Sequence, residues 1–310
     1  MRIILNGQQA FGKAALEAIV KEGKDEVVAV YTAPDKEGRP ADPVKQAAIE
    51  LGLPLFQPPN YKDDAVLAEM ASLEADLMVM AYVIIFVPEA ARNVPKHGAI
   101  CFHPSLLPLH RGPSSINWPI IGGAAETGLT YFWPDDGLDE GAILLQKHVE
   151  VGPDDTLGSI YFEKIFPLGI AATVEAIDLV RAGDPPRIAQ DDSKATYESW
   201  CKKADAELDW SKPAADVYNL IRGTNPQPGA WTTHSGNEVQ IYDSRRQDGD
   251  GTPGEVISVS DDGVVVQAEG GRVTIQRVRP KGGDKMPAAE WAASAGVEPG
   301  TRLGGGRRNG

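Results

Sequence analysis

The sequence predicts an α/β protein, in which a Rossmann-like, doubly wound and mostly parallel sheet precedes a small β-barrel domain of the OB-like type. The chain opens with an apolar run, a glycine-bearing turn, a helical pattern and a second apolar run, which is the order of a parallel β–α–β unit. After Gly183 the helical patterns give way to short apolar runs separated by glycine and aspartate. Such runs are typical of a small antiparallel domain.

The first part of the chain alternates predicted strands with predicted helices. Continuous apolar runs fit strands that are buried on both faces, and apolar residues at helical spacing fit the helices that cover them. The expected strands are residues 2–5, 27–32, 53–56, 77–81, 99–102, 129–133 and 143–149. The expected helices are residues 13–22, 42–51, 62–72, 88–93 and 161–182.

The second part is expected to hold one helix and four short strands. The helix is predicted over residues 214–222, and the strands over residues 238–243, 254–259, 263–268 and 272–278. Residues 186–204 carry prolines and acids without periodicity, which indicates a linker. We therefore expect a catalytic domain over residues 1–185, that linker, a barrel domain over 205–304 and a disordered Gly/Arg-rich tail over 305–310.

Composition limits the partners and the compartment. The length of 310 residues suits two domains. A net charge of −14 repels phosphate backbones, so tRNA is a less favoured partner. The two cysteines, Cys101 and Cys201, do not form a disulfide framework, and no apolar segment approaches the ~18 residues of a membrane span. These features predict a cytoplasmic protein without a membrane partner.

The glycine turn after the first strand invites a dinucleotide interpretation that the sequence does not support. The fingerprint needs a middle glycine between Gly7 and Gly12, and here Ala10 and Phe11 occupy that region. The second strand also ends without the acidic residue that binds a ribose. We therefore expect a tight turn that packs a helix on the sheet, and no NAD(P).

A proline-bracketed loop carries a histidine at the end of one predicted strand. Residues 99–102 lead directly into His103, and ligands bind at the carboxyl ends of strands in open α/β sheets. Pro104 and Pro108 each fix a backbone dihedral and enclose Ser105. This loop is expected to present the imidazole rigidly, as catalysis requires. An ordinary structural hydrogen bond is the alternative role for a loop histidine.

An acidic segment with two glycines follows the predicted strand 129–133. Residues 134–141 read Pro-Asp-Asp-Gly-Leu-Asp-Glu-Gly. A metal loop is one interpretation, but the spacing does not match a helix–loop–helix calcium site and no metal is expected. A solvated acidic turn is a second. In the third, one carboxylate orients the His103 ring and stabilises its protonated form.

In these two segments the chain resembles the folate-dependent formyltransferase family. The family pattern is a His followed by Pro or Gly and Ser-Leu-Leu-Pro, and later an Asp before x-Gly. Here the pattern is met by His103, residues 105–108 and Asp139, and the His and the Asp lie 36 positions apart (103 to 139). The resemblance covers nearly the whole chain. It is closest to the hydrolase domain of 10-formyltetrahydrofolate dehydrogenase and extends to methionyl-tRNA formyltransferase.

The resemblance implies an enzyme of one-carbon metabolism with 10-formyltetrahydrofolate as formyl donor. His103 is then expected to stabilise negative charge on the formyl oxygen, Asp139 to orient His103 and take protons, and Ser105 or loop amides to support the oxyanion. The folate is expected to contact the end of a strand and the acidic segment. The implied contacts are Tyr82, Ile84, Ile85, Phe86, Asp135, Asp136, Gly137, Leu138 and Gly141. The apolar members of this set are equally explained as core residues.

Cys101 departs from the family pattern. Most members carry an Asn two residues before the His, and loss of an oxyanion donor costs on the order of 10²–10³ in rate. A thiol is a weak donor. A nucleophilic role for Cys101 beside His103 and a role as a small buried hydrophobe both remain open.

The hydrolase domain also lacks that Asn, so water or a small amine is the favoured acceptor. Methionyl-tRNA formyltransferase activity and a catalytically weakened folate-binding protein are the alternatives.

Overall fold

The computed structural model describes residues 1–304, and the predicted disordered tail over 305–310 lies outside the described residues. The chain divides into two compact units that are not continuous in sequence. The first consists of Met1–Gly112, Gly128–Val149 and Lys164–Tyr197. The second consists of Pro113–Thr127, Glu150–Glu163 and the chain from Glu198 onward.

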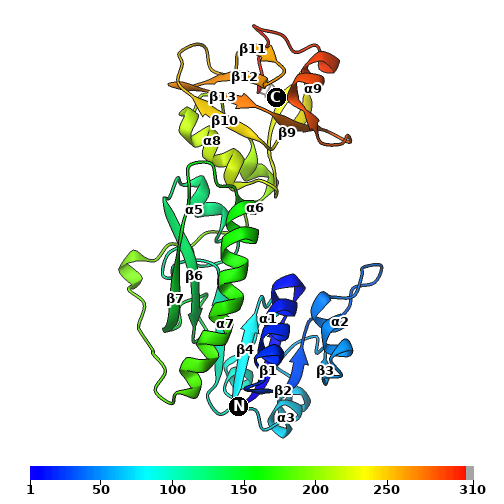
Figure 1. Ribbon diagram of the computed structural model, residues 1–310, viewed down its shortest axis with the longest axis vertical. Helices are drawn as coiled ribbons and strands as arrows, with labels where there is room; N and C mark the ends of the chain where they lie inside the picture. The colour runs from blue at the N-terminus through cyan, green and yellow to red at the C-terminus, as the bar shows by residue number, and fades with distance from the viewer. Residues whose placement is uncertain (305–310) are drawn as a thin grey trace. The chain divides into compact units, whose positions relative to one another are not determined.

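A seven-stranded sheet forms the centre of the first unit, with the strand order β3-β2-β1-β4-β5-β6-β7 (Figure 1). The pairs β1–β2, β1–β4, β2–β3 and β4–β5 are parallel, whereas β5 and β6 are antiparallel. The strands are β1 (Arg2–Gly7), β2 (Glu26–Tyr31), β3 (Leu55–Phe56), β4 (Leu77–Ala81), β5 (Ala99–His103), β6 (Glu126–Phe132) and β7 (Ile143–Glu150). The predicted doubly wound and mostly parallel sheet is thus confirmed.

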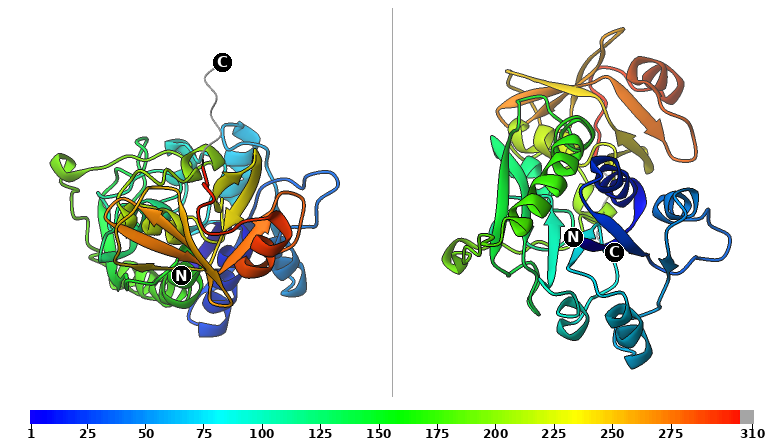
Figure 2. Two further views of the ribbon diagram at one scale, coloured as in Figure 1. Left: turned by 90° about the horizontal axis from the view of Figure 1, so that it is seen from above. Right: turned by 60° about the horizontal axis from the view of Figure 1, so that its bottom comes forward.

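Helices cover both faces of this sheet (Figure 2). On one face Phe11 of α1 packs edge-on against Phe166 of α7, with ring centroids 5.7 Å apart. On the other face Met70 of α3 and Ala91 of α4 join one buried cluster with residues of the central strands. These helices are α1 (Gln9–Glu22), α2 (Pro43–Glu50), α3 (Asp64–Ser72), α4 (Glu89–Arg92) and α7 (Phe166–Arg181).

Local chemistry sets several helix boundaries. Asp42 and Asp63 each accept a hydrogen bond from a main-chain N–H of the first turn, in α2 and α3 respectively. The helix expected over 161–182 is longer and less regular than predicted. It begins with α6 (Leu157–Ser159), passes through a π-helical turn (Ile160–Ile165) and continues as α7.

The second unit is rich in antiparallel β-structure, as predicted. It contains two four-stranded sheets, β10-β13-β12-β11 and β15-β14-β9-β8, around a shared apolar core. The strands are β8 (Ala230–His234), β9 (Asn237–Ile241), β10 (Ser244–Gln247), β11 (Val256–Ser260), β12 (Gly263–Ala268), β13 (Gly271–Ile275), β14 (Arg277–Pro280) and β15 (Met286–Pro287). Its α-helices include α5 (Asn117–Ile121), α8 (Ala214–Gly223) and α9 (Ala288–Ala295).

One expected strand of this unit is two strands. The expected strand 272–278 divides at Gln276, because β13 pairs with β12 whereas β14 pairs with β9 in the other sheet. The chain therefore changes sheets between Ile275 and Arg277. Within residues 1–304, no helix is long and apolar enough to cross a membrane.

Candidate active site

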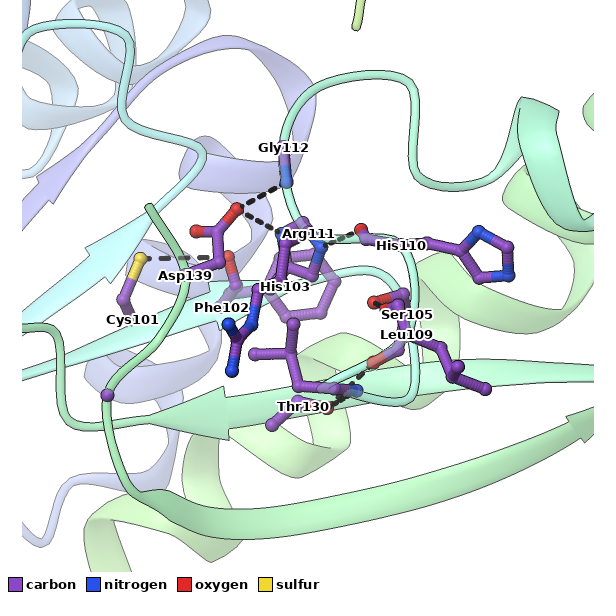
Figure 3. A network of polar contacts seen from close by, with 12 residues as sticks. Cys101, Phe102, His103, Ser105, Leu109, His110, Arg111, Gly112, Thr130 and Asp139 are labelled. Carbon is purple, nitrogen blue, oxygen red and sulfur yellow. Dashed lines mark hydrogen bonds and ion pairs between the residues drawn. The ribbon is translucent and has the colours of Figure 1, made fainter. Parts of the chain in front are cut away.

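His103 is the last residue of β5 and lies at the carboxyl end of that strand, where the sequence predicts it. Its side chain is 8% exposed. The ring atom Nε2 lies 2.8 Å from the main-chain oxygen of His110, which lies on the loop that follows β5. A carbonyl oxygen accepts but never donates, so this contact assigns a hydrogen to Nε2. The other ring nitrogen, Nδ1, faces Asp139 at 3.6 Å from its Oδ2 (Figure 3).

Asp139 occupies the turn that follows β6. Its Oδ2 accepts a hydrogen bond of 2.8 Å from the main-chain N–H of Gly112, so the carboxylate lies between that amide and the ring of His103 (Figure 3). The backbone of Asp139 has a φ of 58°, in the left-handed region that few residues other than glycine adopt. Such a conformation persists where surrounding contacts hold it.

Gln190 supplies those contacts from a distant part of the chain. Its side-chain amide donates to the main-chain oxygens of Asp139 (2.8 Å) and Gly141 (2.7 Å). Its Oε1 accepts from Nε (3.1 Å) and Nη2 (2.8 Å) of Arg111. Gln190 therefore joins the loop after β5 to the loop after β6.

Arg111 is the hub of this arrangement and is 1% exposed. Its guanidinium also contacts Asp192 at 2.7 Å and the Tyr197 hydroxyl at 2.5 Å. The Tyr197 hydroxyl donates to Glu140 at 2.6 Å. Residues 187–197 belong to the segment 186–204 that is expected to be a linker. Side-chain contacts and main-chain bridges at Ile188 and Tyr197 hold them within the first unit.

Cys101 lies on β5, two residues before His103, and is partly buried. Burial, with a smaller effect from the nearby charge of Asp139, raises the pKa of the thiol far above its usual value. The thiol makes a long contact of 3.7 Å with the main-chain oxygen of Phe102. A protonated thiol is a poor nucleophile, so the geometry favours a packing role for Cys101 over the nucleophilic role.

Ser105 stabilises the loop rather than facing the site. The residue is fully buried, and its hydroxyl donates to the main-chain oxygen of Leu109 at 2.7 Å. Its carbonyl accepts from the Thr130 hydroxyl at 2.7 Å. The Ser105 hydroxyl is thus engaged within the loop, and its support of an oxyanion stays a prediction.

The predicted folate contacts form two segments with different properties. After β4, Tyr82, Ile84 and Phe86 are exposed at 46%, 57% and 59%, whereas Ile85 packs against the buried cluster. In the turn after β6, Leu138 is 56% exposed. Exposed apolar side chains of this size suit the face of a ring system better than a core.

The acidic and glycine residues of the second segment have structural contacts of their own. Asp135 accepts from the Gly137 N–H at 3.0 Å and so forms the turn. Asp136 pairs with Arg92 at 2.7 Å. A Cβ at Gly141 would lie 1.8 Å from the carbonyl oxygen of Trp133, so only glycine fits this position.

Arg92 connects the two segments and was not predicted from the sequence. It is 5% exposed, and besides Asp136 it donates to the main-chain oxygen of Val87 at 2.8 Å. The sequence signals that mark Arg111 and Gln190 are weak, because their hydrogen-bond partners described above are 49 residues or more away along the chain. Within residues 1–304, no cluster of three or more His, Cys, Asp or Glu side chains is placed to hold a metal ion.

Comparison with known families decides the class of protein. Residues 1–176 match the family described as formyl transferase, and residues 201–296 match the formyl transferase C-terminal domain. The chain belongs to the formyltransferase family. It is therefore an enzyme of that family, and the resemblance in the His103 and Asp139 segments is confirmed at this level.

Relatives come from more than one branch of the family. The chain is 38% identical over 311 aligned positions to cytosolic 10-formyltetrahydrofolate dehydrogenase of Xenopus laevis, covering 95% of this chain and 34% of the dehydrogenase. It therefore spans about a third of the length of that relative. It is 36% identical to methionyl-tRNA formyltransferase of Geobacter sulfurreducens, covering 98% of this chain and 97% of the relative.

The fold also occurs among solved structures. HypX from Aquifex aeolicus, crystallised with tetrahydrofolic acid, has a TM-score of 0.65 and 20% identity, and the match covers 95% of this chain and 47% of HypX. At this identity the likeness shows the fold alone.

Proposed function

We propose that this chain releases the formyl group of 10-formyltetrahydrofolate to water, giving tetrahydrofolate and formate, or transfers it to a small amine. The observation that carries the proposal is the His103–Asp139 pair at the end of β5, with Nδ1 and Oδ2 3.6 Å apart. Both side chains are largely buried, and the exposed apolar residues Tyr82, Ile84, Phe86 and Leu138 offer a surface for the pterin.

The proposed chemistry assigns one task to each group. Water or an amine attacks the formyl carbon, and negative charge develops on the formyl oxygen. Because Nε2 of His103 donates to the carbonyl of His110, Nδ1 is the ring atom that remains for this oxygen, and it donates when the imidazole is protonated on both nitrogens. Asp139 takes the proton of the nucleophile. The C–O double bond then re-forms and the bond between the formyl carbon and N10 breaks, while N10 takes the proton back from Asp139; formic acid, which ionises to formate, or a formamide leaves.

Water is the preferred formyl acceptor in this proposal, and the reason is the residue at position 101. At the position where most of the family has an Asn, this chain offers a thiol that donates weakly. The similarity to 10-formyltetrahydrofolate dehydrogenases supports this choice. The second candidate, methionyl-tRNA formyltransferase activity, is supported by a match that runs over 97% of the Geobacter sulfurreducens enzyme.

An acceptor comparison tests the proposal. The full chain is incubated with 10-formyltetrahydrofolate alone, with initiator Met-tRNA and with small primary amines, and formate, formyl-Met-tRNA and tetrahydrofolate are measured. We expect formate to appear without an added acceptor. Faster transfer to Met-tRNA than hydrolysis would establish the second candidate. Tight folate binding without turnover in any arm would show a folate-binding protein without catalysis.

A further inference from the structure

A cavity of about 340 Å³ lies in the first unit, where β5 begins and β6 ends. This volume falls within the ~300–1,000 Å³ typical of ligand sites. The cavity shares neither His103 nor Asp139 with the candidate active site. Its walls include Arg92, Lys96, His97, Trp133 and Arg187.

The charge of these walls is unusual for this protein. Three permanently cationic side chains and one histidine line the cavity, and no aspartate or glutamate does. The chain as a whole carries a net charge of −14. Like charges brought together in one concave surface repel one another, and the potential they create attracts anions.

Arg187 is held in place while its hydrogen-bond donors stay free. Its guanidinium lies 3.7 Å from the centroid of the Trp133 ring, and the indole N–H of Trp133 donates to the main-chain oxygen of Pro186 at 2.9 Å. Within the described part of the chain, the Arg187 guanidinium has neither an ion pair nor a hydrogen bond. A planar guanidinium fixed by stacking, with five free donors, suits bidentate binding of an oxyanion.

Lys96 and His97 stand on a turn with a fixed backbone. Their main-chain N–H groups donate to Ala75 at 3.0 Å and Asp76 at 2.7 Å, next to the start of β4. Among residues 1–304, the ammonium of Lys96 has no ion-pair partner. Arg92 differs, because Asp136 and Val87 already engage its guanidinium. Arg187 and Lys96 are therefore the two cations left to bind a ligand.

We propose that this cavity, termed the Arg187 cavity, is a binding site for a multivalent oxyanion, with Arg187 and Lys96 as its principal ligands. Phosphate groups and chains of carboxylates share this chemistry. Trp133 is the first residue of the turn that carries Asp139, and Arg92 contacts Asp136 in the same turn. An anion bound in the cavity would therefore contact the start of this turn. The proposal does not depend on the identity of the formyl acceptor.

Titration calorimetry with the full chain tests the proposal, with inorganic pyrophosphate in one arm and the tripeptide tri-γ-glutamate in the other. We expect saturable binding of at least one probe that weakens as salt is raised. Preference for pyrophosphate points to a phosphate ligand, and preference for the tripeptide to a polycarboxylate chain. No saturable binding of either probe at millimolar concentration overturns the proposal.

Three variants locate the binding. Arg187→Gln and Lys96→Gln should each weaken it by about tenfold or more, because each removes a charge-assisted contact. Lys96→Gln leaves the contact between Arg187 and Trp133 intact. It therefore tests the cavity even if Arg187→Gln fails to fold. The matched control is Lys285→Gln, which removes a cation from a separate cavity of about 370 Å³ that also contains Arg279. If Lys285→Gln weakens binding and the other two do not, the Arg187 cavity is not the site.

Discussion

The side-chain amide nitrogen of Gln190 lies 2.8 Å from the main-chain oxygen of Asp139, and this contact ties a segment without regular structure to the candidate active site. Asp139 has a left-handed backbone, which costs free energy unless neighbours hold it. Gln190 holds it by two donated bonds, and Arg111 fixes Gln190 in turn. Gln190 is thus a positioning residue for the Asp139 carboxylate.

Replacing Gln190 by Glu should separate positioning from folding. A carboxylate still accepts from Arg111, but it donates nothing to the carbonyls of Asp139 and Gly141. Where a residue orients the ligands of a catalytic metal, its loss lowers activity by about 10–100-fold, and we expect a similar effect here. We expect kcat for formate release to fall by that factor with a smaller change in KM. Asp191→Asn is the control, since Asp191 contacts Ser193 and Lys194 and does not touch Arg111. Equal activity of Gln190→Glu and the control would refute the positioning role.

His103 and Asp139 should behave as one unit. We expect His103→Ala and Asp139→Asn each to lower kcat by about 10²–10⁴, the range for a positioned acid or base. Asparagine keeps an oxygen that accepts from Gly112, so the Asp139→Asn loop should remain folded.

The double variant gives the sharper measurement. It should lose little more activity than either single variant, because each group needs the other. If the losses of activation free energy in this double-mutant cycle were additive, the two side chains would act separately. His148→Gln, on the exposed face of β7, serves as the histidine control.

The sequence predicts the strand that ends at His103 because the apolar run over 99–102 stops there and the next residues are Pro104 and Ser105. Periodicity reports burial along one segment, and these elements are local. Gln190, by contrast, is recognisable only through partners at Arg111, Asp139 and Gly141, which no local pattern encodes. The segment around it is held by these side-chain contacts and by isolated main-chain bridges of Ile188 and Tyr197, not by a long helix or strand that would show a period.

The second unit shows the same limit in its strands. Buried residues alternate as far as Ile275, and the alternation resumes one position out of phase at Val278, where the chain has left β13 for β14. Pairing partners, which the pattern does not contain, decide that these are two strands. Strand β8 and helix α9 are not among the expected elements. Strand β8 has few apolar positions, and α9 is short and buries Ala288, Trp291 and Ala292 against the shared core.

Cys101 should be dispensable for turnover. Because burial raises the pKa of its thiol, the neutral form persists at pH values where an ordinary thiol, with a pKa of about 8.5, ionises. The dependence of kcat on pH between pH 7 and pH 9 should therefore be the same for Cys101→Ala and for the unchanged protein. The value of kcat for Cys101→Ala should stay within a few-fold of that of the unchanged protein.

Alkylation gives an independent measurement on the same residue. Burial also raises the pKa of Cys201, to about 11, and the shift at Cys101 is larger. Iodoacetamide at pH 8, followed by mass spectrometry, should modify Cys201 before Cys101. Rapid modification of Cys101 with loss of activity would revive the nucleophilic role.

Gly141 and Gly137 offer a matched pair for the loop that carries Asp139. A Cβ at Gly141 meets the rigid carbonyl oxygen of Trp133 at 1.8 Å, whereas a Cβ at Gly137 meets the mobile end of the Glu140 side chain at 2.3 Å. Gly141→Ala must therefore move main chain, and overpacking of this kind costs about 1–3 kcal/mol or more. Gly137→Ala displaces the Glu140 carboxylate from its contact with the Tyr197 hydroxyl, but its three nearest contacts are all side-chain atoms of Glu140. Thermal unfolding should show a clearly lower Tm for Gly141→Ala and a small shift for Gly137→Ala. Equal shifts would mean that the turn relaxes around the added methyl group, and that contact with Trp133 does not define its geometry.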